Sequence, residues 1–354
     1  MHTKICDILV VGAGPAGSSA ACAAAAAGSR VVVVERRRTI GVPVRCAEYI
    51  PRALLGVLDL DRSYVVQPIR SMRTVLPDGT VKETMAPGLT IRRDIFDQAL
   101  AERAKEQGAE LITGTRVVGR DGEAVIIKGP DGQMNSIKAE VIIGADGPHS
   151  VVRRWMGIGR GHMIPALQVK ARLSRPMECT EVHFRSDIYG GYGWVFPKDG
   201  EANVGLAIVG GSRWSRPLRQ AMEVFFNALK RDGKVKGQAQ RPIAGWIPVS
   251  PVSDAIKENM AIVGDAAGHT HPITGAGVPQ AIICGSMLGR YASEAVKTHD
   301  LGLLRQYDQG WKDEFGDTLR LAAERRRLLE TQWGRLDEII RSCWVVFKEY
   351  YGRA

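Results

Sequence analysis

The hydrophobic pattern is sharpest at the start of the chain, where three unlike segments follow one another. Residues 8–11 form a short apolar run, residues 16–27 are small and mostly alanine, and residues 31–34 are four valines. Short β-branched runs favour buried strands, whereas an alanine-rich segment favours a helix. Glycines separate the first strand from the helix. The pattern therefore predicts a strand, a glycine turn, a helix and a second, parallel strand.

Strand and helix patterns continue along the chain. Residues 64–92 alternate between polar and apolar positions around an Asp78–Gly79 turn, which is typical of antiparallel strands. Further strand patterns cover residues 110–118, 124–128, 139–143, 166–208 and 260–263. Helix patterns cover residues 94–107 and 217–230, a long segment from 277, and the chain from 311 to its end. The order of these elements predicts an α/β protein whose second sheet is antiparallel.

The first glycine turn has the spacing of a dinucleotide-binding motif. Gly12 suits the tight turn, Gly14 lets a pyrophosphate approach the backbone, and Gly17 lets the helix pack closely on the strand. The helix that begins near residue 15 turns its free amide groups toward the phosphates, and Glu35 ends the second strand where a ribose hydroxyl would lie. An acid at this position favours a free 2′-hydroxyl, as in FAD or NAD. The arginines at 36–38 are interpreted as a solvated loop.

Composition limits the classes to which the protein can belong. With 45% hydrophobic and 24% charged residues among 354, the chain suits a globular protein of two domains. A net charge of +10 suits an acidic partner, but the sequence has no recognisable nucleic-acid-binding motif, so we expect no nucleic acid. The six cysteines are scattered without a CxxC pair, which argues against a zinc site and a disulfide framework. We expect no metal.

Two segments bear on location. Residues 8–29 are uncharged, but a Gly-Pro pair and three further glycines favour a buried core over a leader or a membrane span, so we expect a cytoplasmic protein. Near the C-terminus, arginines such as Arg325 and Arg326 mix with aromatic residues such as Trp333 and Trp344. A solvated charged face above a packed aromatic face is the preferred interpretation. Peripheral contact with a membrane or an acidic protein is the alternative.

Further motifs follow the glycine turn in a fixed order. Arg93 precedes the helix at 94–107, Asp146–Gly147 follows the strand at 139–143, and Gly264–Asp265 follows the strand at 260–263. In this order the motifs resemble the FAD-dependent p-hydroxybenzoate hydroxylase structural group. The resemblance implies FAD as the cofactor, with Asp265 on its ribityl chain and Arg93 close to it. It also implies a Rossmann-like FAD-binding domain interleaved with an antiparallel-sheet substrate domain, and a helical C-terminus follows.

No repeat or low-complexity linker separates the two domains, so we expect the chain to pass between them. The predicted FAD-binding domain takes residues 1–63, 93–158 and 255–300. The predicted substrate domain takes residues 64–92 and 159–254, and residues 301–354 form the C-terminal helices.

Within that group, three segments are similar to the geranylgeranyl reductase family. Residues 40–48 match its Gly-x-Pro-x-x-Cys-Gly-Glu element with Ala47 where a glycine is usual, and residues 192–198 match its Tyr-x-Trp-x-Phe-Pro element. Residues 271–277 match its Asp-Pro-Ile-Thr-Gly-Gly-Gly loop, with His271 in place of the acid. This loop is expected to bring backbone amides to flavin N1 and O2. The resemblance implies cofactor contacts at Gly12, Gly14, Ala16, Gly17, Glu35, Arg36, Arg45, Cys46, Ala47, Arg93, Val117, Asp146, Gly147, Gly264, Asp265, Gly275, Ala276, Gly277 and Val278.

The resemblance also implies reduction of carbon-carbon double bonds in a prenyl chain by reduced FAD. Such a reaction needs a hydride on one carbon and a proton on the other, inside a dry apolar site. Cys46 is expected at that site because it lies in a loop after the dinucleotide unit. Arg45 beside it could favour the thiolate or bind a phosphate. An inert buried thiol is the alternative.

Four other residues are candidates for catalysis or for lining the site. Tyr192 and Trp194 alternate along a strand, so both side chains share one side, either as a wall of the substrate site or as core aromatics. His269 and His271 are spaced to face one way in a loop beside the flavin. They could relay a proton or anchor a carboxylate, or they could be hydrogen-bonded loop residues.

Other activities suit the same fold. An FAD-dependent monooxygenase that hydroxylates an aromatic group on a small molecule or on a peptide is the second enzyme class, because function lies in the site and not in the fold. A flavin-binding assembly partner without turnover is the third interpretation. Because the chain has no second GxGxxG motif, the electron donor is expected to be NAD(P)H bound transiently in the same cleft, or a small electron carrier.

Overall fold

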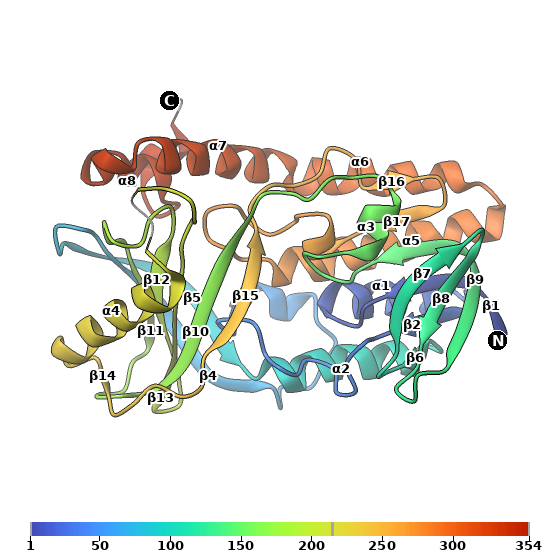
Figure 1. Cartoon of the computed structure of the whole chain (residues 1–354), viewed down its shortest axis with the longest axis horizontal. Helices are drawn as coiled ribbons and strands as arrows, with labels where there is room; N and C mark the ends of the chain where they lie inside the picture. Colours follow the sequence, from blue (N-terminus) through green and yellow to red (C-terminus); the bar gives the residue numbers. More distant parts are fainter. Residues whose placement is uncertain (1, 214–215, 353–354) are drawn as a thin grey trace.

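The computed structural model describes residues 2–213 and 216–352, which form two sheets joined side by side along the long axis of the molecule (Figure 1). Among these residues the first sheet has the order β16-β17-β9-β1-β2-β6, with β7 and β8 beside β9. Its strands are β1 (Thr3–Val11), β2 (Val31–Val34), β6 (Glu110–Ile112), β7 (Arg116–Asp121), β8 (Ala124–Lys128), β9 (Met134–Gly144), β16 (Ile256–Lys257) and β17 (Met260–Ile262).

The centre of the first sheet is parallel and buried. Leu9 of β1 lies opposite Val32 of β2 on one side and opposite Ile142 of β9 on the other. All four valines of β2 are buried. Uninterrupted apolar runs are typical of parallel strands that are covered on both faces. The predicted strand, turn, helix and strand are thus confirmed.

The second sheet has the order β14-β10-β13-β12-β11-β4-β5-β3 among the described residues, with β15 beside β10. Every pairing in it is antiparallel except that of β11 with β4. Its strands are β3 (Tyr49–Pro51), β4 (Val65–Val75), β5 (Val81–Ile91), β10 (Met163–Leu173), β11 (Cys179–His183), β12 (Tyr192–Lys198), β13 (Glu201–Ala207), β14 (Val235–Lys236) and β15 (Ile243–Pro248). Because β3 belongs to this sheet, the chain crosses to the second sheet before residue 63. The exact division into domains stays a prediction.

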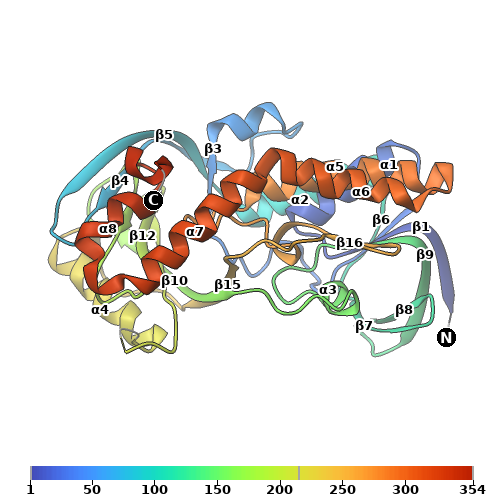
Figure 2. The same ribbon diagram turned by 90° about the horizontal axis from the view of Figure 1, so that it is seen from above.

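Helices cover both sheets, as Figure 2 shows from above. Short helical turns among the described residues are η1 (Arg52–Gly56), η2 (Gly264–Ala266), η3 (Leu301–Leu303), η5 (Trp333–Arg335) and η6 (Lys348–Tyr351). The longer helices are α1 (Pro15–Ala26), α2 (Arg93–Glu106), α3 (Val151–Trp155), α4 (Leu218–Arg231), α5 (Val278–Thr298), α6 (Leu304–Trp311), α7 (Asp317–Thr331) and α8 (Leu336–Cys343), and a π-helical turn at Lys312–Gly316 joins α6 to α7. The side chains of α4 pack on one face of the second sheet, and those of α7 and α8 pack on the other. No described helix is long and apolar enough to cross a membrane.

The C-terminal segment differs from the sequence prediction in two respects. The chain is not helical throughout, because Trp344 adopts an extended conformation after α8 and places its indole in the second sheet, where Nε1 donates to Thr74 Oγ1 at 2.9 Å. The arginines do not all lie on a solvated face, because Arg325 and Arg326 are only 4% and 3% exposed. The expected aromatic packing is confirmed, since Trp333 and Trp344 are both buried.

Candidate active site

The N-terminus of α1 has the shape and charge that a dinucleotide phosphate requires. A Cβ on Gly12 would lie 2.5 Å from the carbonyl oxygen of Ala145, and one on Gly17 would lie 1.9 Å from that of Gly12, so both positions need glycine. Gly14, by contrast, has open space where its Cβ would be. The helix has no side-chain cap and no acid in its first turn. Its positive end therefore lies free beside open space, which fits a pyrophosphate.

Glu35 lies at the end of β2 and joins three segments around this turn. Its carboxylate accepts the amide of Ala13 at 2.9 Å and the amide of Arg37 at 2.8 Å, and its carbonyl accepts the amide of Thr115 at 3.0 Å. Val117, which lies two residues further along on β7, is half-buried. Arg36 and Arg38 are exposed, as the solvated-loop interpretation predicts, whereas Arg37 is half-buried and donates to the carbonyl of Pro43. Glu35, Arg36 and Val117 thus surround the end of β2, where the ribose is expected.

Two acids follow neighbouring strands of the first sheet. Asp146, after β9, accepts the amide of Val151 at 2.6 Å through Oδ2, while its buried Oδ1 has no partner among the described residues. Asp265, after β17, accepts the hydroxyl of Thr270 at 2.7 Å. Burial raises the pKa of both carboxyl groups. A buried oxygen without a partner costs free energy, so Asp146 suits a ligand that donates a hydrogen bond. These positions fit FAD.

The loop at 271–277 leads into α5, whose N-terminus has no side-chain cap and no acid in its first turn. Two elements of the substrate side hold this loop. The hydroxyl of Tyr192 donates to the carbonyl of Thr274, and Arg326 of α7 donates to the carbonyls of Pro272 at 3.0 Å and Gly190 at 2.6 Å. Burial raises the pKa of Tyr192, so its phenol stays protonated and keeps donating. The dipole of α5 favours negative charge at its free end, as reduced flavin requires.

Cys46 lies in the segment between β2 and β3 and is half-buried. Its thiol accepts the amide of Glu48 at 3.2 Å and interacts with the guanidinium of Arg93, which also makes a bidentate ion pair with Asp97 at 2.9 and 3.1 Å. Burial disfavours the charge on Arg93, but Asp97 and Cys46 outweigh it, so the pKa of Arg93 rises above its ordinary value. The sequence suggested that Arg45 could favour the thiolate or bind a phosphate; in the structure Arg45 is exposed, and Arg93 is the arginine that interacts with the thiol.

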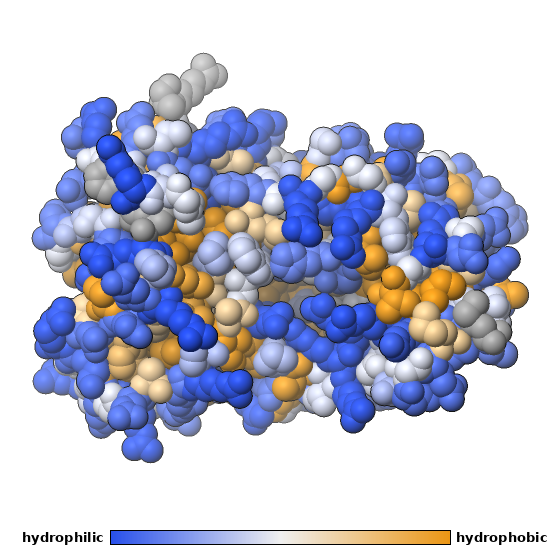
Figure 3. Space-filling model, viewed as in Figure 1, coloured by the Kyte–Doolittle hydropathy of each residue, from blue (hydrophilic) through white to orange (hydrophobic). Residues whose placement is uncertain are grey.

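Aromatic side chains from β12 face the Cys46 segment. Tyr192 and Trp194 lie on one side of the strand, as predicted, with ring centroids 6.2 Å apart. The indole of Trp194 donates to Gln168 Oε1 at 3.1 Å, and Gln168 Nε2 donates to the carbonyl of Cys46 at 3.0 Å. Trp194 also packs in an apolar cluster with Ile164, Ala207 and Val249, against which Ala47 packs. Figure 3 shows the molecule hollowed near its middle, between β15 and α1 in the view of Figure 1.

The two histidines of the loop are buried and neutral. His271 Nδ1 accepts the amides of Ile273 and Thr274 at 3.3 and 3.2 Å, so this nitrogen shapes the loop, in agreement with a hydrogen-bonded loop residue. His269 stacks on Trp311 with ring centroids 4.8 Å apart, and neither ring nitrogen has a partner among the described residues. Burial lowers the pKa of His269 to about 3 and that of His271 to about 4.

Acid is therefore expected to destabilise the fold through these two rings. The unfolded chain binds a proton on each histidine near pH 6.5, whereas the folded chain does not until about pH 4 for His271 and about pH 3 for His269. Their stabilising contribution is complete above pH 6.5 and falls as the pH drops, by about 1.4 kcal/mol per pH unit for each ring. Urea unfolding of His269→Phe between pH 6 and pH 4 should show a slope shallower by about that amount. An unchanged slope would contradict the prediction.

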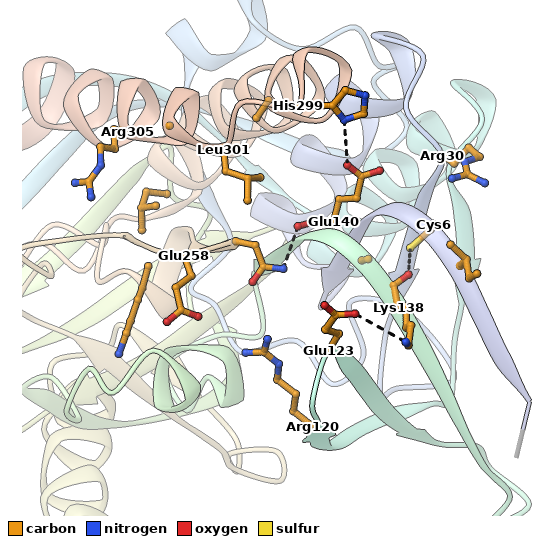
Figure 4. Close-up of a pocket in the computed structure, with 17 residues that line it drawn as sticks. Cys6, Arg30, Arg120, Glu123, Lys138, Glu140, Glu258, His299, Leu301 and Arg305 are labelled. Atoms are coloured by element: carbon orange, nitrogen blue, oxygen red, sulfur yellow. Dashed lines mark hydrogen bonds and ion pairs between the residues drawn. The ribbon is translucent and has the colours of Figure 1, made fainter.

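A separate hollow lies elsewhere, at the far end of the first sheet. It measures about 770 Å³, and Figure 4 shows that ion pairs cross its wall, from Lys138 to Glu123 and from His299 to Glu140. No predicted site residue lines it. The hollow is therefore not the candidate site.

Among the described residues no cluster of histidine, cysteine or acidic side chains could hold a metal ion. The described cysteines are all free.

Sequence reasoning missed several residues that build the site. Glu48, Lys198 and Asn203 lie inside or beside the recognised motifs, but their partners are far away in the chain and could not be read from spacing. Gln168 and Arg326 lie outside any motif, and no sequence signal would have found them.

Comparison with known proteins now adds the family. A family model described as an FAD binding domain matches residues 81–313, and one described as an FAD dependent oxidoreductase matches residues 7–152. The chain is 32% identical to digeranylgeranylglycerophospholipid reductase 1 of Methanococcoides burtonii, over 97% of this chain and 88% of the relative. It is 34% identical to the digeranylgeranylglycerophospholipid reductase of Methanosarcina acetivorans, over 90% of this chain and 83% of the relative.

Solved structures share the fold. A geranylgeranyl bacteriochlorophyll reductase-like protein from Thermoplasma acidophilum superposes with a TM-score of 0.82 and 28% identity, covering 95% of this chain and 92% of that one. PqsL of Pseudomonas aeruginosa in complex with 2-aminobenzoylacetate superposes with a TM-score of 0.71 and 20% identity, covering 95% and 100%, and this likeness concerns the fold alone. The protein is an FAD-dependent enzyme. On the identity with its relatives and the match of the family models, the chain belongs to the geranylgeranyl reductase family of FAD-dependent oxidoreductases.

Proposed function

We propose that the protein reduces carbon-carbon double bonds in the prenyl chains of an isoprenoid lipid. Sequence identity of 32% over 97% of the chain to a digeranylgeranylglycerophospholipid reductase supports this substrate class. The observation that carries the proposal is the aromatic pair of Tyr192 and Trp194, which Gln168 joins to the segment that carries the Cys46 thiol. An isoprenoid offers no hydrogen bonds, so an apolar site with one proton source suits its chemistry.

Each residue of the site is proposed to have a distinct role in the reaction. Bound FAD, once reduced, supplies the hydride. The Cys46 Sγ holds the proton that the second carbon receives, and the guanidinium of Arg93 stabilises the thiolate that remains. Tyr192 and Trp194 exclude water from the reacting carbons and orient the chain. His271 shapes the loop at 271–277 through its two amide hydrogen bonds.

Three groups of residues are proposed to hold the cofactor. The first receives the pyrophosphate and ribose at Gly12, Gly14, Ala16, Gly17, Glu35, Arg36 and Val117. The second contacts the ribityl chain and isoalloxazine from the Cys46 side, at Arg45, Cys46, Ala47 and Arg93. The third lies at the ends of β9 and β17 and before α5, at Asp146, Gly147, Gly264, Asp265, Gly275, Ala276, Gly277 and Val278.

The electron donor and the location are proposed on the charge of the chain. A net charge of +10 suits either NAD(P)H, with its phosphates, or a small acidic electron carrier. The same charge and a lipid substrate favour a cytoplasmic protein that contacts an anionic membrane surface.

One experiment tests the reaction directly. The yellow protein is reduced with dithionite in the absence of oxygen and mixed with geranylgeranylated glycerophospholipid, while flavin reoxidation and product mass are followed. The expected result is reoxidation together with a mass gain of one hydrogen pair per double bond. Reoxidation only when air is admitted, with the lipid unchanged, would contradict the proposal and favour an oxygenase.

A further inference from the structure

A buried acid, Glu48, stands two residues after Cys46 and has no role in the reaction as described so far. It is 1% exposed, and its φ of +68° is a left-handed conformation that a glutamate seldom adopts. A strained backbone of this kind persists only where the surroundings fix it, and it is most frequent at functional sites. The cause must therefore lie in the contacts of Glu48.

The carboxylate of Glu48 joins three elements. Oε1 accepts the backbone amide of Arg93, at the N-terminus of α2, at 2.9 Å. Oε2 accepts hydrogen bonds from Lys198 Nζ at 2.6 Å and from Asn203 Nδ2 at 2.9 Å. Lys198 is only 14% exposed, so both members of this ion pair have lost most of their hydration. A buried charge is tolerated only when its partners satisfy it, and removing one partner leaves the other uncompensated.

Hydrogen bonds also fix the backbone from Cys46 to Glu48. The carbonyl of Cys46 accepts Gln168 Nε2 at 3.0 Å, that of Ala47 accepts Asn203 Nδ2 at 3.1 Å, and that of Glu48 accepts the amide of Ile91 at 2.9 Å. Three consecutive carbonyl groups are thus held by three different strands. On this fixed backbone, the amide of Glu48 donates to the Cys46 sulfur.

A second hollow lies on the other side of this contact. It measures about 390 Å³, and Glu48, Lys198 and Val44 line it, whereas Cys46 does not. Water that enters this hollow reaches the ion pair first. On this side of the molecule, the pair therefore lies between the hollow and the segment that carries the thiol.

We propose that Glu48 is a positioning residue, and that with Lys198 and Asn203 it forms a latch that holds the Cys46 thiol beside Arg93 and keeps water away from it. This inference rests on the proposed function of Cys46. The chemistry gives the reason for such a device, because a proton donor must keep one orientation toward the reacting carbon and must not be hydrated.

The test is the rate at which a maleimide alkylates Cys46 in the FAD-loaded protein, read from the mass of the peptide that contains it. Glu48→Gln leaves Lys198 without its counter-charge, so the segment should open and alkylation should accelerate at least tenfold. Lys198→Met should act in the same direction, and Lys198→Arg, which keeps the charge, should restore a rate near that of the wild type. In turnover, kcat should fall in Glu48→Gln while KM changes little.

Glu181→Gln is the matched control. Glu181 is also a buried acid of the second sheet, paired with Lys234 at 2.7 Å and with His183 at 3.0 Å, but it lies on the face that α4 covers, away from Cys46. The Glu181→Gln variant should be less stable than the wild type, but the alkylation rate of Cys46 should not change. An unchanged rate in Glu48→Gln, or equal acceleration in both variants, would overturn the latch. Because alkylation needs no substrate, a protein that fails to reduce prenyl lipids but shows this difference would refute only the proposed function.

Discussion

Replacing Cys46 by alanine is expected to slow reoxidation of the reduced enzyme by a prenyl lipid about 100- to 1000-fold, the contribution typical of a positioned general acid. The apolar cluster around Trp194 does not include this side chain, and Cys46 is one of many proposed cofactor contacts, so the variant should still bind FAD and lipid; its flavin content is measured first, and rates are compared per bound flavin. Anaerobic stopped-flow absorbance of the flavin measures the effect in a single turnover, separately from electron supply.

Cys22→Ala is the appropriate control, because Cys22 is the other half-buried cysteine among the described residues. It lies on α1, packs against the apolar core of the first sheet, and its thiol donates to the carbonyl of Arg103. Its loss should leave the rate within about twofold of the wild type. If Cys46→Ala reoxidises at the wild-type rate, the proton comes from another group and the thiol is structural.

The second large effect is expected at Gly14. A valine there meets open space in the protein alone, and the backbone, with φ −76° and ψ −179°, accepts any residue. The apoprotein should therefore fold and melt within about 3 °C of the wild type. The side chain would occupy the approach to the amides of α1, so FAD affinity should fall at least 100-fold, or about 3 kcal/mol. Fluorescence titration of apoprotein with FAD measures it.

Two further glycines distinguish this effect from a general loss of packing. Gly56→Val, at another position with open space, should change neither affinity nor melting temperature. Gly17→Ala places a methyl group 1.9 Å from the carbonyl oxygen of Gly12, so it should impair folding as well as binding. A Gly14→Val protein that retains FAD at wild-type affinity would show that the phosphates bind elsewhere.

The sequence predicted the nucleotide-binding half of this molecule well because its signals are local. The turn from Gly12 to Gly17, the four valines of β2 and the acid at Glu35 occupy one short segment, and each is recognisable from its neighbours. The strand and helix boundaries followed from the same short-range patterns, and β12 presents Tyr192 and Trp194 on one side as its alternation requires.

What could not be predicted depends on residues far apart in the chain. The partner of the Cys46 thiol is Arg93, not the adjacent Arg45, because the loop folds back onto the start of α2. Arg326 reads as one more cation in a basic helix, yet it is buried and bonds Pro272. Trp344 does not continue the expected helix, because its indole donates a hydrogen bond to Thr74, which lies 270 residues earlier in the chain. The spacing of apolar residues along the chain carries no information about contacts between residues that are far apart in sequence.

The contact between α1 and α5 sets an order for biosynthesis. Gly285 and Gly289 bring α5 so close that a Cβ on either would lie within 2.4 Å of a backbone oxygen of Ala16 or Ala20. The helix that begins the nucleotide unit is thus completed by one that leaves the ribosome more than 250 residues later. Until then, the surface of α1 that α5 covers stays open, although β1, β2 and α2 already pack on the helix, and the nascent chain is exposed to aggregation. Cofactor capture must therefore be a late event, after most of the chain has been made.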